Sequence, residues 1–172
     1  RIDREKHKYY VIAIHGDNKR LRFPWKIAPL QVIIVPIAYE KNKKVLDQAK
    51  KIKIALEKID INCDIDLSEK SLCEKFYFWE MKGVPLRIEL GPKELKSKKL
   101  VVFRRDNNEK TIISEKGLSK YIEKTADDID KNLTKQADSL FKNKIIDAKS
   151  KEELRNIINN GKIARINFCS ME

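Results

Sequence analysis

Apolar positions in the first third of the chain fall first into continuous runs and then into helical spacing. The runs at residues 9–14 and 31–39 predict strands. The second run is typical of a strand covered on both faces, and Pro36 is expected to end it. Further on, apolar residues recur at steps of four and three, which predicts a helix with one buried stripe. The stripe consists of Val45, Ala49, Ile52, Leu56 and Ile59.

The middle of the chain predicts one helix among several strands. A helix is expected over residues 71–82, because Gly83 with Pro85 beyond it is the usual order for a helix end. Gly91 and Pro92 predict a turn. Strands are expected at residues 62–67, 85–90, 99–105 and 110–114, the last two joined by a tight turn.

A long amphipathic helix is expected from Leu118 onward, because apolar residues repeat there at helical steps. Its stripe comprises Ile122, Thr125, Ile129, Leu133, Ala137 and Leu140. One more helix is expected over residues 151–160, ended by Gly161 before a final strand over 162–168. Strands that alternate with helices indicate an α/β fold, with helices packed on a mixed sheet.

The balance of charge indicates a polyanion as partner. The chain has 172 residues, with 38 Lys and Arg against 26 Asp and Glu, a net charge of +12 and a pI near 9.5. Such a balance is expected of a nucleic-acid binder, although a lysine bias that only aids solubility explains it as well. The length suits one ordinary domain and part of another.

The sequence argues against a membrane span, a secretory leader, a disulfide framework and a metal site. No apolar run approaches the length of a membrane span, and the polar opening is unlike a secretory leader, so we expect no membrane contact and a cytoplasmic location. The three cysteines Cys63, Cys73 and Cys169 have no paired spacing, which argues against a disulfide framework and against a metal site complete within the chain.

The candidate chemistry lies between residues 75 and 110, where an acid, aromatic residues and arginines surround a turn and two strands. The Glu80 carboxylate can accept a hydrogen bond from an exocyclic amine, and the Arg87 guanidinium donates in a planar fork to a base edge or a phosphate. We expect both side chains to project into water from one side of the sheet. The alternative for Glu80 is an ordinary solvated or salt-bridged acid.

For two neighbouring features, only some of the residues are expected to face RNA. The aromatic run at residues 76–79 can stack on bases, but about two of its members are expected in the core, because successive helical residues point in different directions. Arg104 and Arg105 lie on one strand and therefore on opposite faces, so at most one of them can face RNA and the other is expected to pair with an acid. His15 lacks a suitably placed nucleophile, so a catalytic role is not expected.

Several strings in the chain resemble one family. The strings are WEMKGVPLRIELGPKEL, the later FRRD with EK after it, HGD near residue 15, and EELRNIINNGKIARINFC near the end. They are similar to the C-terminal part of prolyl-tRNA synthetase, a class II synthetase, of the archaeal and eukaryotic type. The resemblance implies a five-stranded mixed sheet with three helices, followed by part of a small α/β domain. It divides the chain into the end of a catalytic domain with a linker (1–30), an anticodon-binding domain (31–133) and the incomplete start of a zinc-type C-terminal domain (134–172).

The resemblance also implies the partner, proline tRNA, whose second and third anticodon bases are guanines. Glu80, Arg87 and Lys110 fall on family positions that contact these bases, and Arg104 and Lys93 are further candidates for anticodon binding. Guanine presents N1 and N2 donors to a carboxylate, and O6 and N7 acceptors to Arg or Lys.

The chain alone is expected to catalyse nothing and to hold no cofactor. In the full-length ligase the resemblance implies ATP and magnesium, and a homodimer. Many relatives hold zinc with four cysteines, the first at the position of Cys169, but a lone thiolate cannot complete a tetrahedral site, so no zinc is expected.

Two alternatives remain open from the sequence. One is a non-catalytic regulatory or dimerising module that derives from an anticodon-binding domain. The other is nonspecific RNA binding by charge alone, which would show a steep salt dependence without sequence preference.

Overall fold

The computed structural model describes residues 13–18 and 21–167. The chain forms two compact units, residues 1–133 and 134–172.

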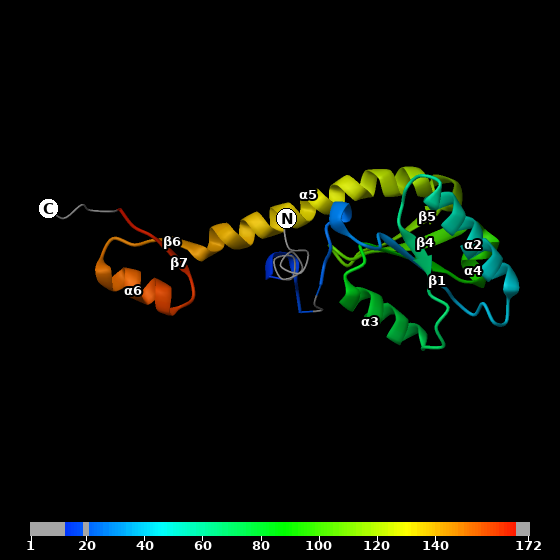
Figure 1. Ribbon diagram of the computed structural model, residues 1–172, viewed down its shortest axis with the longest axis horizontal. Coiled ribbons are helices and arrows are strands. Elements are labelled where there is room, and N and C mark those ends of the chain that lie inside the picture. The colour runs from blue at the N-terminus through cyan, green and yellow to red at the C-terminus, as the bar shows by residue number, and fades with distance from the viewer. Residues whose placement is uncertain (1–12, 19–20, 168–172) are drawn as a thin grey trace, which may run out of the picture. The chain divides into compact units, whose positions relative to one another are not determined.

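A five-stranded mixed sheet forms the centre of the first unit (Figure 1). Its strands are β1 (Val32–Pro36), β2 (Cys63–Ile65), β3 (Leu86–Leu90), β4 (Lys99–Arg104) and β5 (Lys110–Ser114). The spatial order is β2-β1-β3-β4-β5, with β1 parallel to β2 and β3, and β4 antiparallel to β3 and β5. The expected α/β fold with a five-stranded mixed sheet is therefore confirmed.

Helices cover both faces of this sheet. They are α2 (Lys43–Glu57), α3 (Leu72–Lys82), the short α4 (Pro92–Ser97) and the long α5 (Leu118–Lys144), with single 3-10 turns η1 (Trp25–Ile27) and η2 (Glu115–Gly117). In Figure 1, α3 lies on one side of the sheet, and α2 and the first part of α5 lie on the other.

The core explains why the β1 run is apolar without interruption. Val32 and Ile34 pack on one face against the stripes of α2 and α5, while Ile33 and Val35 face the α3 side. All five residues of β1 are buried. A strand in the middle of the sheet with helices on both faces needs apolar residues at every position.

The helical stripes are confirmed except at their ends. In α2 the first four expected positions are buried, but Ile59 is 47% exposed because the helix ends at Glu57 and the periodicity ends with it. In α5 the stripe is buried up to Leu133, and Leu140 is 54% exposed.

Two local expectations need correction. Residues 13–15 are helical, so the strand expected over 9–14 is wrong at its end, and residues 9–12 lie outside the described part. A short apolar run does not by itself distinguish strand from helix. Helix α4 follows the expected turn at Gly91, where the Glu94 carboxylate accepts from the Gly91 N–H at 3.0 Å, and was not expected.

The second unit contains a parallel pair of short strands, β6 (Ile145–Asp147) and β7 (Ile163–Arg165), connected through α6 (Lys151–Asn159). Ser150 caps α6, and Gly161 follows it with φ of 67°. Strand β6 was not expected. Among the described residues, no helix has both the length and the apolar character needed to cross a membrane.

Candidate nucleic-acid interface

Helix α3 is fixed at both ends by local chemistry. At its start the Ser71 hydroxyl accepts from the Glu74 N–H, and the Glu74 carboxylate accepts from the Ser71 N–H, which forms a capping box. At its end Gly83 has φ of 75°, a conformation that favours glycine. A Cβ at Gly83 would lie 2.7 Å from the carbonyl oxygen of Leu21. These contacts set where the last turn of α3, with Glu80, lies against the sheet.

Strand register places four further residues on one face of the sheet. Arg87 on β3 pairs with Phe103 on β4, and Phe103 pairs with Lys110 on β5. Paired residues share a sheet face, and so does Glu89, two residues beyond Arg87. Glu80, Arg87, Glu89 and Lys110 form what we call the charge cluster.

Arg87 is the centre of the charge cluster. Its Nη1 donates to the Glu80 carboxylate at 3.0 Å and to the backbone oxygen of Phe76 at 3.4 Å. Its Nε and Nη2 donate to one oxygen of Glu89 at 3.2 and 3.0 Å. The structure therefore brings Glu80 and Arg87 together, as the sequence predicted, and adds Glu89, which sequence reasoning missed.

The expectation that Arg87 projects into water is wrong. Only 3% of the residue is exposed. Its guanidinium carbon lies 3.9 Å from the ring centre of Phe76 and 4.3 Å from that of Phe103, so two aromatic faces enclose it. Phe76 comes from α3 and Phe103 from β4, and a cation between such faces is stabilised by their quadrupoles. Arg87 orders its neighbours from below the surface.

The exposed member of the charge cluster is Lys110. Its side chain is 49% exposed, and its ammonium nitrogen lies 2.9 and 3.0 Å from the two oxygens of Glu89. The side chain of Glu80 is 14% exposed and that of Glu89 is 9% exposed. Two carboxylates and two cations leave the charge cluster with no net charge.

The surroundings of the charge cluster are partly apolar and open. Tyr77 is 60% exposed and lies three residues before Glu80, hence on the same side of α3. On β5, Ile112 is 67% exposed on the face that carries Lys110, so α3 does not cover this edge of the sheet. Phe76 and Trp79 pack against the core, as expected for about two of the four aromatic residues.

The structure does not bring the other two candidates to the charge cluster. Arg104 lies on the opposite face, where it donates to Asp106 at 3.1 and 2.8 Å, and Asn132 of α5 donates to the same carboxylate. Lys93 is exposed on α4, after the end of β3 that is remote from Arg87. Arg105, which directly follows β4, also pairs with an acid, Asp17, so both arginines are paired.

The sequence contained a signal for Glu89 but not for Phe103. Residues 87 and 89 are two positions apart on one strand, so their side chains must lie on the same face of the sheet. Phe103 required the pairing of β3 with β4, which a pattern along one strand does not give.

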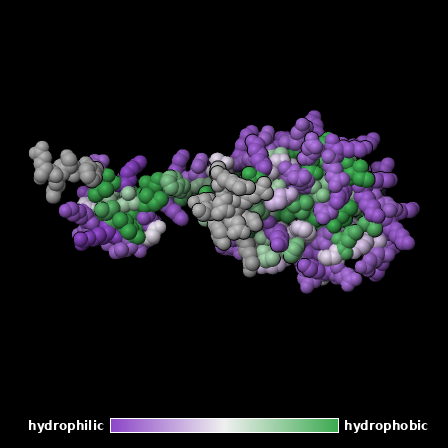
Figure 2. All heavy atoms as spheres, in the orientation of Figure 1, coloured by the Kyte–Doolittle hydropathy of each residue, from purple (hydrophilic) through white to green (hydrophobic). Residues whose placement is uncertain are grey.

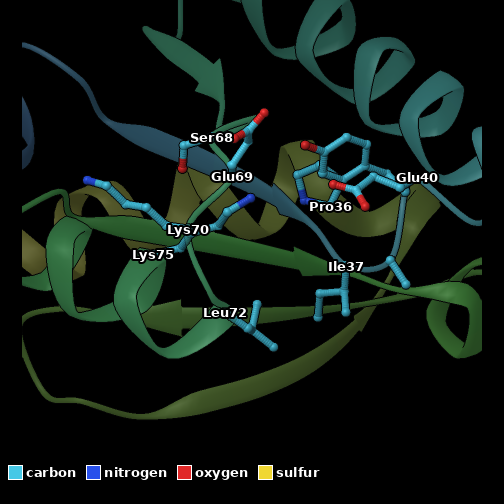
Figure 3. A pocket seen from close by; sticks show the side chains of 10 residues that line it. Pro36, Ile37, Glu40, Ser68, Glu69, Lys70, Leu72 and Lys75 are labelled. Atoms are coloured by element: carbon cyan, nitrogen blue, oxygen red, sulfur yellow. The ribbon is translucent and has the colours of Figure 1, made fainter.

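A shallow hollow of about 170 Å³ lies at the carboxyl ends of β1 and β2 (Figure 3). Acids and bases line it together, among them Glu40, Glu69 and Lys70. Lys75, buried at its edge, lies 3.9 Å from the carboxylate of Asp66. Burial alone would raise the pKa of Asp66, but hydrogen bonds from Ser68 and Trp79, with Lys75 nearby, hold this pKa below its usual value.

No group of three or more His, Cys, Asp and Glu side chains in residues 13–18 and 21–167 is placed to hold a metal ion. Burial raises the pKa of the Cys63 thiol to about 11, so it is protonated at neutral pH and a poor ligand. Cys169 lies outside the described residues.

A family model described as "Anticodon binding domain" matches residues 31–125, which is more than half of the chain. The chain belongs to the anticodon-binding domain family. The matched residues contain the whole five-stranded sheet and every member of the charge cluster.

Proline–tRNA ligases are among the relatives that this chain matches over most of its length. The chain is 36% identical over 165 residues to a proline–tRNA ligase of Thermofilum pendens, covering 94% of this chain and 34% of the relative. A proline–tRNA ligase of Methanocaldococcus jannaschii is 39% identical over 153 residues, covering 86% and 33%, and one of Clostridium botulinum is 38% identical over 150 residues, covering 87% and 31%. The chain thus spans about one third of the length of these relatives.

Proposed function

We propose that the charge cluster recognises the anticodon guanines of proline tRNA. The Glu80 carboxylate accepts from N1–H and N2–H of a guanine, and the Lys110 ammonium donates to O6 or N7. Arg87 holds the carboxylates of Glu80 and Glu89 in place and does not itself contact a base. The observation that supports this proposal most is the network of hydrogen bonds that joins these four side chains within an anticodon-binding domain.

The surface around the charge cluster suits an unstacked base. Tyr77 offers an exposed aromatic face beside Glu80, and anticodon bases in a loop are free to stack on such a side chain. Hydrophilic side chains cover most of the visible face of the first unit (Figure 2), and the chain carries a net charge of +12 that attracts the phosphates. Attraction and base selection are then tasks of different residues.

We also propose that the chain acts within a proline–tRNA ligase, a role supported by the relatives of that name. In that setting, anticodon binding orients the tRNA so that its acceptor end reaches an activated amino acid made with ATP and magnesium, which is a proximity effect. A homodimer of the whole ligase belongs to the same proposal.

Binding of short RNA hairpins tests the proposal. The 172-residue chain is titrated with a fluorescent anticodon hairpin of proline tRNA, and with the same hairpin carrying adenines in place of the two guanines. We expect the chain to prefer the guanine hairpin by about 1–3 kcal/mol per base read. Glu80→Gln, which keeps the size of the side chain but presents an amide donor to the guanine donors, should remove most of this preference.

Lys51→Ala is the matched control. Lys51 is an exposed lysine of α2, so its loss should weaken both hairpins by the same small factor. Equal affinity of the unmodified chain for the two hairpins would rule out guanine recognition and favour binding by charge alone.

A further inference from the structure

Arg105 follows β4 directly and is the largest of the fully buried side chains among the described residues, with 1% of the residue exposed. Its Nη1 and Nη2 donate to the two carboxylate oxygens of Asp17 at 2.7 and 2.6 Å. Its Nε donates to the backbone oxygen of Glu80 at 2.9 Å. One guanidinium therefore connects a segment before the sheet with the last turn of α3.

The contact with Glu80 involves a group that a helix leaves without an internal partner. Carbonyl oxygens in the last turn of a helix need hydrogen-bond donors from outside the helix. The Glu80 carbonyl receives one from the Gly83 N–H at 3.1 Å and one from Arg105. Arg105 thereby fixes the backbone of the residue whose side chain belongs to the charge cluster.

The segment before the sheet lies against the same end of α3. The Arg22 Nε donates to the His15 oxygen at 2.6 Å and lies 3.9 Å from Asp17. The Phe23 N–H donates to the Gly83 oxygen at 3.1 Å. Displacement of Asp17 would therefore change the support beneath Glu80. Paired, charge-assisted hydrogen bonds of this kind are strong and directional.

We propose that Arg105 is a positioning residue that couples residues 13–18 to RNA recognition by Glu80. The inference rests on the proposed function, because it requires that Glu80 contacts a base. Coupling between two sites is reciprocal. RNA bound at the charge cluster must then stabilise residues 13–18, and loss of the Asp17 carboxylate must weaken selection of guanine.

Hydrogen exchange on the unmodified chain gives the first test. Amide exchange of a peptide that covers residues 13–18 is measured by mass spectrometry, with and without the guanine hairpin. We expect slower exchange when the RNA is bound. Unchanged exchange at saturating RNA would overturn the coupling, and this measurement needs no substitution and so does not depend on whether a variant folds.

Asp17→Asn gives the second test, with Asp47→Asn as the matched control. Asp47 is an exposed residue of α2, so its substitution makes the same chemical change away from Arg105. We expect Asp17→Asn to lower the preference for the guanine hairpin by about fivefold or more and to abolish the RNA-dependent slowing of exchange. Asp47→Asn should behave as the unmodified chain.

The outcomes separate this inference from the proposed function. If the unmodified chain prefers guanine and Asp17→Asn keeps that preference, the coupling is wrong and the proposed function stands. If Asp17→Asn weakens both hairpins by the same factor, Arg105 has only a structural role and the coupling is again wrong. If the unmodified chain shows no preference for guanine, both fail.

Discussion

Arg87 is surrounded by two carboxylates and two aromatic rings, and this environment changes what the side chain can do. A buried guanidinium with four hydrogen bonds to the protein acts mainly by fixing its partners. Under the proposed function, Glu80 and Lys110, which reach the surface, are the groups that contact a base. In the charge cluster, contact and support belong to different residues.

Substitution of Arg87 should therefore affect stability more than substitution of Lys110. Arg87→Ala leaves the carboxylates of Glu80 and Glu89 without their buried cation and should lower the free energy of unfolding by about 3–5 kcal/mol. Lys110→Ala removes a half-exposed partner and should cost at most about 1 kcal/mol. Urea denaturation followed by tryptophan fluorescence measures both. Similar losses for the two variants would contradict this account of the charge cluster.

The sequence predicted that Glu80 and Arg87 meet but not how deeply each is buried. Glu80 and Arg87 are seven residues apart across a helix end and a turn, so their proximity followed from local pattern. The burial of Arg87 depends on Phe76 and Phe103, which come from two other elements. Such contacts depend on how neighbouring strands pair, and the hydrophobic pattern of one strand does not predict that pairing.

At the scale of elements, helix α3 shows what local signals can specify. Ser71 and Glu74 define its start, and Gly83 defines its end, all within a short stretch of sequence. Helix α4 has only six residues, too few for a helical period to emerge from the hydrophobic pattern, and it was missed. Strand β6 is similarly short, with three residues.

The end of α3 should tolerate no side chain at Gly83. Gly83→Ala places a Cβ at positive φ and against backbone atoms of Leu21, so the free energy of unfolding should fall by more than the ~1–2 kcal/mol that the conformation alone costs. Gly117→Ala is the control in the same unit, because its Cβ would meet only the Ser114 hydroxyl, at 3.1 Å. Thermal unfolding compares them, and a Gly83→Ala variant as stable as Gly117→Ala would refute the close contact.

For the whole molecule, charge and specificity have separate locations. The net charge of +12 belongs largely to lysines in solvated runs, whereas the charge cluster sums to zero. Salt screens exposed charges much more than buried pairs. The free energy of RNA binding should consequently have a salt-sensitive contribution from the exposed lysines and a salt-insensitive contribution from the charge cluster.

Raised salt should weaken the guanine and adenine hairpins in parallel. For each hairpin the logarithm of the affinity should fall linearly with the logarithm of the salt concentration, by about 0.7 per phosphate neutralised in a single strand. The ratio of the two affinities should stay constant, which titrations between 50 and 300 mM salt, a range of about sixfold, would measure. A ratio that falls toward one as salt rises would place base selection on exposed charges instead.

Neither the division of the molecule nor its strand order followed from the hydrophobic pattern. The stripe expected in α5 continued to Leu140, whereas the structure buries it only up to Leu133, and the boundary expected before residue 134 came from resemblance to a family. The spatial order β2-β1-β3-β4-β5 places β1 between two strands that follow it in the chain, and hydrophobic pattern alone does not select that order. The sequence predicted the strands and a mixed sheet but not their order.

The electrical neutrality of the charge cluster has a kinetic consequence. Long-range fields govern how fast an RNA arrives, and short-range contacts govern how long it stays. Replacing solvated lysines should therefore slow association and leave residence time nearly unchanged. Substitution of Glu80, or of the residues that hold it, should shorten the residence time of the RNA without changing the association rate. An RNA with the wrong anticodon would then be rejected because it dissociates faster.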